Sequence, residues 1–160
     1  MRVIATIGVV LALSAFPAYP GDLQDGLKFY QSKDYASAAA SWRNAADQGN
    51  ASAQAAMGLL YEKGQGVAQD NQQALSWYRK AAEQGNAPAQ TNLGFMYEKG
   101  QGVGQDNVQA VSWYRKAAEQ GTAEAQFNLG RMYQTGQGVA QDHKLAASWF
   151  QKAGTQGHVW

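Results

Sequence analysis

Residues 87–122 of the sequence read APAQTNLGFMYEKGQGVGQDNVQAVSWYRKAAEQGT, and this 36-residue stretch decides the fold. Versions of it occur three times without a gap, at 51–86, 87–122 and 123–158. The first and second blocks are identical at 26 positions, and the second and third at 21. Such direct repetition is typical of a repeat protein, in which each unit stacks on its neighbours and none folds alone.

Each block is predicted to form two helices. In the first half of 51–86, apolar side chains recur with the spacing of one helical face, at Ala53, Met57, Leu60 and Tyr61. In the second half the same spacing is found at Ala74, Trp77, Tyr78 and Ala81. Gly64 is expected to end the first helix, and Asp70 to cap the second. The pattern therefore predicts an all-α fold of antiparallel helix pairs.

Two further segments precede the blocks. Residues 22–50 match the end of a block in part, so we expect a degenerate helix pair that caps the N-terminal end of the array. Residues 1–18 have the composition of a secretory signal peptide, with an apolar run at 3–15. That run is shorter than the roughly 20 residues of a membrane-spanning helix, which makes an uncleaved anchor the weaker alternative. We expect a periplasmic or secreted protein with no integral membrane segment after cleavage.

The composition excludes several classes of site. The formal net charge is +1, so no excess of positive charge is present to neutralise phosphates, and nucleic acid is not an expected partner. Without cysteine the chain has no disulfide, no thiolate nucleophile and no Cys-ligated metal. The two histidines, His143 and His158, have no acidic cluster beside them. We therefore expect no metal site and no other cofactor.

Two features that resemble catalytic motifs are better explained by structure. Residues 100–104, Gly-Gln-Gly-Val-Gly, resemble a phosphate-binding loop, but they follow a predicted helix and not a strand. A serine precedes the tryptophan of each second helix, and no histidine occupies a matching position in the repeat. Residues that every block carries are explained by packing that every block needs, so we expect no catalytic residues and no enzymatic activity.

Residues 87–121 carry a more specific pattern. They read Ala-x-Ala-Gln-x-x-Leu-Gly-x-Met-Tyr-x-x-Gly-x-Gly-Val-x-x-Asp and then Ala-x-x-Trp-Tyr-x-Lys-Ala-Ala-x-Gln-Gly. This resembles the Sel-one-like repeat (SLR), a subfamily of the tetratricopeptide repeats. The resemblance covers 51–158 closely, with local departures in the last block, and 22–50 in degenerate form. It implies a right-handed α-solenoid of antiparallel helix pairs. It also implies a family that mostly scaffolds complexes or binds peptides and protein domains, often in the bacterial envelope.

The blocks differ from one another on one face of the first helix. The variable positions have helical spacing and lie opposite the invariant packing stripe. The resemblance to tetratricopeptide repeats places them on the concave, ligand-facing surface. The candidate partner-binding residues are Ala55, Leu59, Glu62, Thr91, Asn92, Phe95, Glu98, Phe127, Asn128 and Arg131. The alternative is that these are solvent-facing positions that drifted after duplication.

The content of this face is typical of a protein or peptide ligand. Leu59, Phe95 and Phe127 would provide apolar anchors, and the two asparagines could hydrogen-bond an extended backbone. Arg131 could receive a carboxylate. We therefore expect a non-catalytic envelope adaptor or scaffold that binds a protein segment in its concave groove. Two alternatives stay open: a dedicated inhibitor or immunity protein that masks a toxic or lytic enzyme, and a small-molecule binder or enzyme.

Two expectations concern the ends of helices and of the chain. The Glu-Lys pairs at 62–63 and 98–99 are interpreted as solvated helix ends. Trp160 is a second candidate site, because no further helix covers the last pair. Either Trp160 folds back over this end, or the end docks on a partner or on a second copy and forms a homodimer.

Overall fold

The structure, a computed structural model, describes residues 19–155, and these fold into eight α-helices. The helices in chain order are α2 (Tyr19–Gln31), α3 (Tyr35–Asp47), α4 (Ala51–Lys63), α5 (Asn71–Glu83), α6 (Ala87–Lys99), α7 (Asn107–Glu119), α8 (Ala123–Thr135) and α9 (His143–Gly154). No strand occurs in this part of the chain. The predicted all-α solenoid of helix pairs is confirmed.

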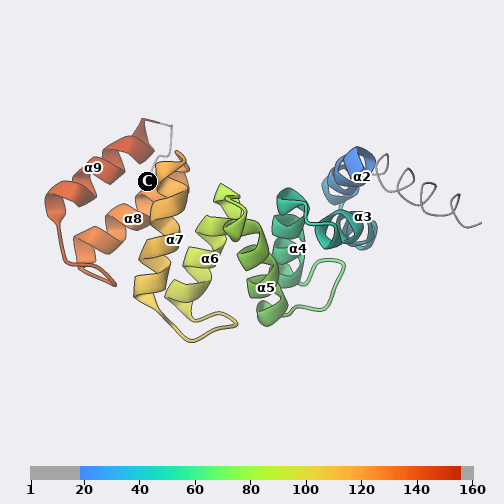
Figure 1. The fold of residues 1–160 in the computed structure, drawn as a ribbon, viewed down its shortest axis with the longest axis horizontal. Helices are drawn as coiled ribbons and strands as arrows, with labels where there is room; N and C mark the ends of the chain where they lie inside the picture. Colours follow the sequence, from blue (N-terminus) through green and yellow to red (C-terminus); the bar gives the residue numbers. More distant parts are fainter. Residues whose placement is uncertain (1–18, 156–160) are drawn as a thin grey trace, which may run out of the picture.

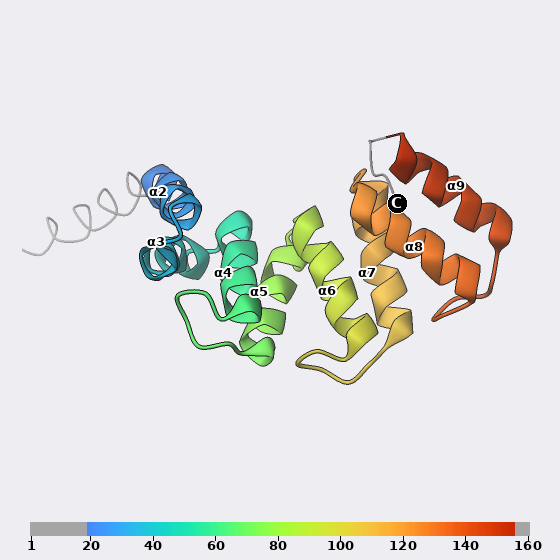
Figure 2. The ribbon, with the colours of Figure 1, turned by 180° about the vertical axis from the view of Figure 1, so that it is seen from behind.

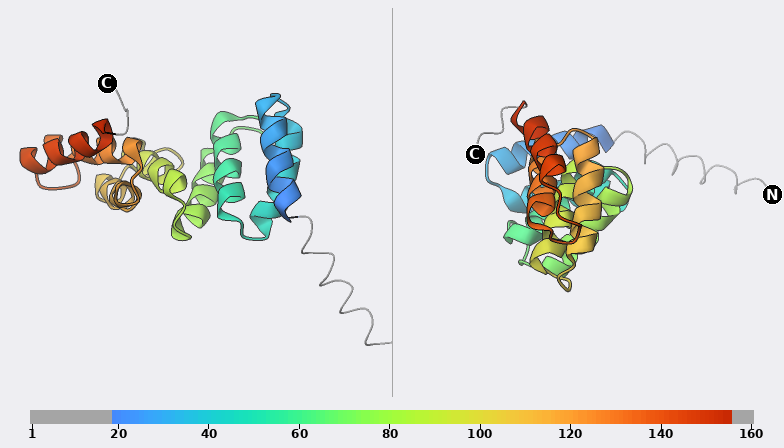
Figure 3. Two further views of the ribbon diagram at one scale, coloured as in Figure 1. Left: turned by 90° about the horizontal axis from the view of Figure 1, so that it is seen from above. Right: turned by 90° about the vertical axis from the view of Figure 1, so that its left-hand side faces the viewer.

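Every helix packs on the helices that precede and follow it in the sequence. The closest partners are the pairs α2–α3, α4–α5, α6–α7 and α8–α9, and the second helix of each pair also packs on the first helix of the next. The pairs stand side by side along a curved path (Figure 1). The direction of the helix axes changes from one end of the array to the other (Figure 3), so the stack is a superhelix.

The predicted apolar stripes form the core. In α4 the side chains of Ala53, Met57 and Leu60 are fully buried. In α5 the Tyr78 ring is also fully buried, and it packs against Gly58 of α4 so closely that a Cβ at this glycine would overlap the ring. Alternation of small residues with large rings lets neighbouring helices approach closely at high packing density.

Glycines end the first helices as predicted. Gly64, Gly100 and Gly136 each occupy the C-cap in the left-handed conformation, with φ of 64°, 67° and 70°. The left-handed backbone conformation costs glycine little free energy and costs other residues considerably more. Asp70 caps α5 by accepting hydrogen bonds from the amides of Gln72 and Gln73, again as predicted.

The Gly-rich loops, which join the two helices of a pair, also contact the pair before them. The loops of the α4–α5 and α6–α7 pairs lie along the same side of the molecule (Figure 2). A second loop glycine, Gly102, also has positive φ, and a Cβ on it would overlap the carbonyl group of Asn71 at the start of α5. Gly66 and Gly138 make the same approach to the preceding pair. Each loop therefore packs on the pair before it.

The N-terminal helix pair is held by different contacts from those of the repeats. The indole of Trp42 on α3 donates a hydrogen bond to the carbonyl of Leu23 on α2, and Asp34 caps α3. The proposed signal peptide at 1–18 and Trp160 lie outside the described residues. No helix within 19–155 is both long and apolar enough to span a membrane.

Candidate functional site

Eight of the ten candidate residues are at least partly exposed. They lie on the first helices of three successive pairs, α4, α6 and α8, on one side that we call the first-helix face. This face carries Ala55, Leu59, Glu62, Asn92, Phe95, Phe127, Asn128 and Arg131. The other two candidates, Thr91 and Glu98, are buried, with exposed fractions of 3% and 4%. The expectation that all ten are surface positions is therefore wrong for these two.

Thr91 is buried because its position faces the neighbouring helices. Its hydroxyl donates a hydrogen bond to the carbonyl of Ala87 one turn earlier, at 3.0 Å. This local bond satisfies a hydroxyl group that would otherwise be costly to remove from water. Thr91 therefore supports α6 and offers almost no surface to a ligand.

Glu98 is the centre of a polar network and not part of a solvated helix end. Its Oε2 accepts hydrogen bonds from the Tyr114 hydroxyl at 2.9 Å and from Arg131 Nη2 at 2.6 Å. Its Oε1 accepts one from Lys99 Nζ at 2.7 Å. A carboxylate is tolerated in a buried position only when it is paired in this way.

The network sets the protonation of its members. Burial would raise the pKa of Glu98, but the hydrogen bonds from Arg131, Lys99 and Tyr114 outweigh it, so the pKa lies below its ordinary value. Burial, and then the neighbouring negative charge of Glu98, raise the pKa of the Tyr114 phenol. Glu98 is thus a carboxylate and Tyr114 a neutral donor at neutral pH.

Arg131 is consequently engaged within the chain. It reaches from α8 to Glu98 on α6 and joins the second repeat to the third. The sequence-based expectation left its guanidinium free to receive the carboxylate of a ligand. In the structure this guanidinium already holds an internal carboxylate.

The first repeat has the same carboxylate and phenol but not the arginine. Glu62 accepts a hydrogen bond from the Tyr78 hydroxyl at 2.8 Å and one from Lys63 at 3.0 Å. The Glu62 side chain is 20% exposed, compared with 4% for Glu98. The carboxylate of the first repeat is therefore more exposed to solvent than that of the second, and it lacks the contact with an arginine.

The apolar candidates are unequally exposed. Phe95 on α6 is 39% exposed, and the Lys99 ammonium lies 5.7 Å from its ring centroid. Leu59 packs in part on the core around α5 and α6. The Phe127 ring packs on Phe150 of α9, with 5.4 Å between centroids. Phe95 is therefore the most exposed aromatic side chain on the first-helix face.

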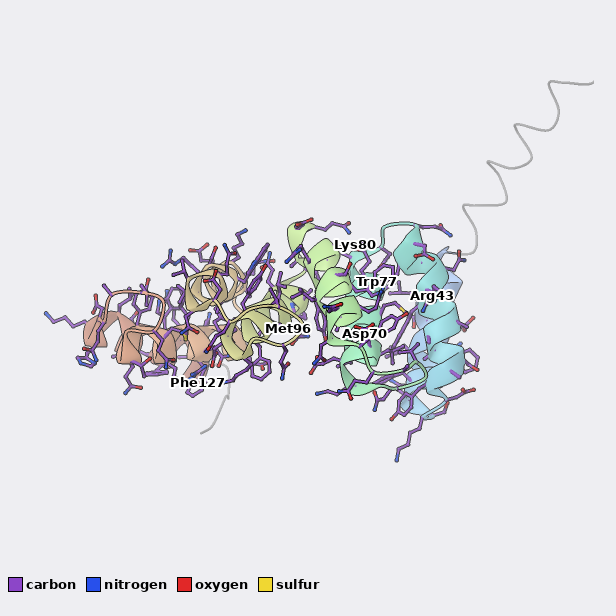
Figure 4. The ribbon with its side chains drawn as sticks, turned by 90° about the horizontal axis from the view of Figure 1, so that it is seen from below. Arg43, Asp70, Trp77, Lys80, Met96 and Phe127 are labelled. Atoms are coloured by element: carbon purple, nitrogen blue, oxygen red, sulfur yellow. The ribbon has the colours of Figure 1, made fainter. Side chains whose placement is uncertain are left out.

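Several recurring contacts were missed by the sequence reasoning. The guanidinium of Arg79 donates to the hydroxyl of Tyr97 in the next repeat at 2.8 Å, and Arg43 and Arg115 make the same bond to the tyrosine 18 residues on. On α5, α7 and α9 a lysine ammonium covers a tryptophan ring, as Lys80 does Trp77 at 4.3 Å (Figure 4). The lysine and the tryptophan recur in all three blocks, and this recurrence was the available signal for their contact, whereas Gln151 replaces the arginine in the last block.

The described residues offer no assembled chemistry for a metal. Within 19–155, no three His, Cys, Asp or Glu side chains gather closely enough to hold an ion. His143 is exposed at the first position of α9, and His158 lies outside the described residues. The first-helix face carries the exposed ring of Phe95, the amides of two asparagines and the carboxylate of Glu62.

The repeats match a protein-family model, and the chain is similar to several solved structures. The family model described as the Sel1 repeat matches residues 51–86, 87–122 and 123–158. A Sel1 repeat protein from Oxalobacter formigenes is 42% identical, with a TM-score of 0.81 over 85% of this chain and 56% of that one. The protein c5321, a protective antigen of uropathogenic Escherichia coli with an SLR fold, is 39% identical, with a TM-score of 0.86 over 99% of this chain and 34% of that one.

The chain thus spans between a third and somewhat over half of the length of these two proteins. MamA shares the fold, with a TM-score of 0.62 at 20% identity over 91% of this chain and 82% of that one. Comparison with curated proteins gives no match. The predicted resemblance to Sel-one-like repeats is confirmed by the family match and by the two more similar structures.

Proposed function

We propose that this chain, which belongs to the Sel1 repeat family, is an exported and non-catalytic module that holds a segment of a partner protein on its first-helix face. Sel1 repeat proteins are generally protein-interaction modules, and their fold is typically a scaffold without catalytic activity. The apolar run at 3–15 supports export, because it has the length and position of a signal peptide.

The exposed ring of Phe95 carries the proposal. It lies on the middle one of the three first helices, in which the invariant residues Ala89, Gln90 and Gly94 are buried. An exposed aromatic side chain surrounded by polar groups is the usual composition of a binding hot spot. Leu59 on α4 and Asn92 on α6 are also partly exposed, and they add apolar area and an amide to this face.

Affinity capture from an envelope extract of the producing organism tests this proposal. The baits are the wild-type chain, Phe95→Ser and Val108→Ser. Val108 on α7 is the matched control, because it is also apolar and is 65% exposed but lies outside the first-helix face. We expect a partner that the wild type and Val108→Ser retain and Phe95→Ser loses. Identical captures by all three baits would refute binding through this face.

The identity of the captured protein separates the finer alternatives. An inhibitor or immunity protein should capture one enzyme at nanomolar or tighter affinity, whereas an adaptor should hold several envelope proteins more weakly. Capture of only a second copy of the chain would indicate the homodimer. Turnover of a small substrate by the purified chain would contradict the non-catalytic role.

A further inference from the structure

We propose that Glu62 and Tyr78 hold the guanidinium group of an arginine side chain of the partner protein, as Glu98 and Tyr114 hold Arg131 of this chain. The proposal rests on the proposed function and adds that the bound segment of the partner contains an arginine. It follows from comparing two repeats that carry the same carboxylate and phenol, of which only one has its arginine.

The second repeat provides the template. Glu98 Oε2 accepts from the Tyr114 hydroxyl and from Arg131 at the same time, at 2.9 and 2.6 Å. A carboxylate oxygen has two lone-pair directions, and here both are used. The arginine comes from the next first helix, 33 residues further along the chain.

In the first repeat the corresponding position holds a residue without a donor. The residue 33 positions after Glu62 is Phe95, so an aromatic ring takes the repeat position of Arg131. Glu62 Oε2 accepts from the Tyr78 hydroxyl at 2.8 Å, and Lys63 binds the other oxygen. The second acceptor direction of Oε2 therefore has no equivalent of Arg131, and the side chain keeps 20% of its surface exposed.

The surroundings favour an arginine over other cations. A guanidinium group can donate to a carboxylate and stack on an aromatic face, and Phe95 presents such a face beside Glu62 in the repeat register. The Lys99 ammonium lies 5.7 Å from the centroid of that ring. Lys99 and Arg131 share Glu98, so a local lysine such as Lys63 does not exclude an arginine.

The third repeat shows that the site is not general to the blocks. Gln134 and Phe150 replace the carboxylate and the phenol there. The third repeat thus lacks the carboxylate and the phenol, and in the second repeat they hold the chain's own Arg131. In the first repeat both groups are present without an arginine at the corresponding position. By the repeat register, the exposed ring of Phe95 stands to Glu62 as Arg131 stands to Glu98.

The test uses two capped peptides, acetyl-Gly-Arg-Gly-amide and the same peptide with citrulline, which keeps the shape of arginine but has no charge. Binding to the full chain is followed by NMR through the side-chain signals of Glu62 and Tyr78. We expect the arginine peptide to bind about tenfold more tightly than the citrulline peptide, the factor for a charge-assisted hydrogen bond at a partly exposed site. Glu62→Gln, which keeps the shape and removes the charge, should abolish the preference.

Two exchanges of residues between the repeats sharpen the test. Phe95→Arg should supply an internal arginine and block the peptide, whereas Val108→Arg adds the same charge elsewhere and should leave binding unchanged. Arg131→Phe should open a second site at Glu98, visible as shifts of the Tyr114 signals. Each variant is first shown to be folded by its amide spectrum.

Equal binding of both peptides, no detectable binding, or retention of the preference in Glu62→Gln would overturn the arginine assignment. This outcome is distinguishable from failure of the proposed function. If Phe95→Ser loses a protein partner but the arginine peptide does not bind, the arginine assignment is wrong and the proposed function stands. If the arginine peptide binds but no partner is captured through the first-helix face, the proposed protein-binding function is wrong.

Discussion

Replacement of Arg131 by methionine should destabilise the chain by breaking the contact between the second and third repeats. Methionine keeps much of the apolar stem and removes the guanidinium, which leaves a carboxylate that is 4% exposed with two donors in place of three. A hydrogen bond to a charged group contributes about 1.5–3 kcal/mol. Because 31% of the Arg131 side chain is exposed to solvent, we expect the lower part of that range, about 2 kcal/mol.

The assay is urea unfolding at neutral pH, followed by far-UV circular dichroism. It compares wild type, Arg131→Met, Glu98→Gln and the double variant in a double-mutant cycle. The two residues are in direct contact, so their coupling energy should reach about 1 kcal/mol or more. It should also persist at high salt, since a buried pair is screened less than an exposed one. A coupling energy below about 0.5 kcal/mol would refute the account of this network.

Three further predictions concern the same fold. The pKa of Glu98 is lowered in the folded chain, so its stabilising contribution is present above the unfolded value of about 4.3 and is lost as the pH falls further. The stability difference between wild type and Glu98→Gln, measured by urea unfolding, should therefore shrink in acid; a constant difference would contradict this. Gly102→Ala should cost more than about 2 kcal/mol, because its φ is +68° and its Cβ would overlap a carbonyl group, whereas Gly104→Ala, in open space, should change the melting temperature little. Asn86→Ala should cost about 1 kcal/mol through loss of its capping bond, and Thr122→Ala, whose side chain makes no such bond, should cost clearly less in the same assay.

The helix pairs were predictable because their signals are local. Gly64 and Asp70 lie at the ends of helices whose apolar spacing is visible within one block, and the structure places both as expected. Cap residues and periodicity depend on neighbours within about one turn, so a single sequence contains the necessary information. Because the same pattern occurs in three blocks, the prediction of two helices per block does not depend on any single block.

The environment of Glu98 was not predictable in the same way. Its phenol donor is 16 residues away and its arginine 33 residues away, on two different helices. Helical spacing placed Glu98 on the variable face, but it gave no information on which side chains of the next pair reach across. Thr91 was misplaced for the same reason, since its burial depends on the helices that pack beside α6.

The central claim is that a protein partner contacts the first-helix face, and site-specific photo-crosslinking tests it most directly. A benzophenone amino acid is placed at position 95 or, as the matched control, at position 108, and the chain is irradiated in envelope extract. We expect covalent adducts with one or a few proteins at position 95, suppressed by an excess of wild-type chain, and none of these adducts at position 108. The same adducts at both positions, or none at position 95, would contradict it.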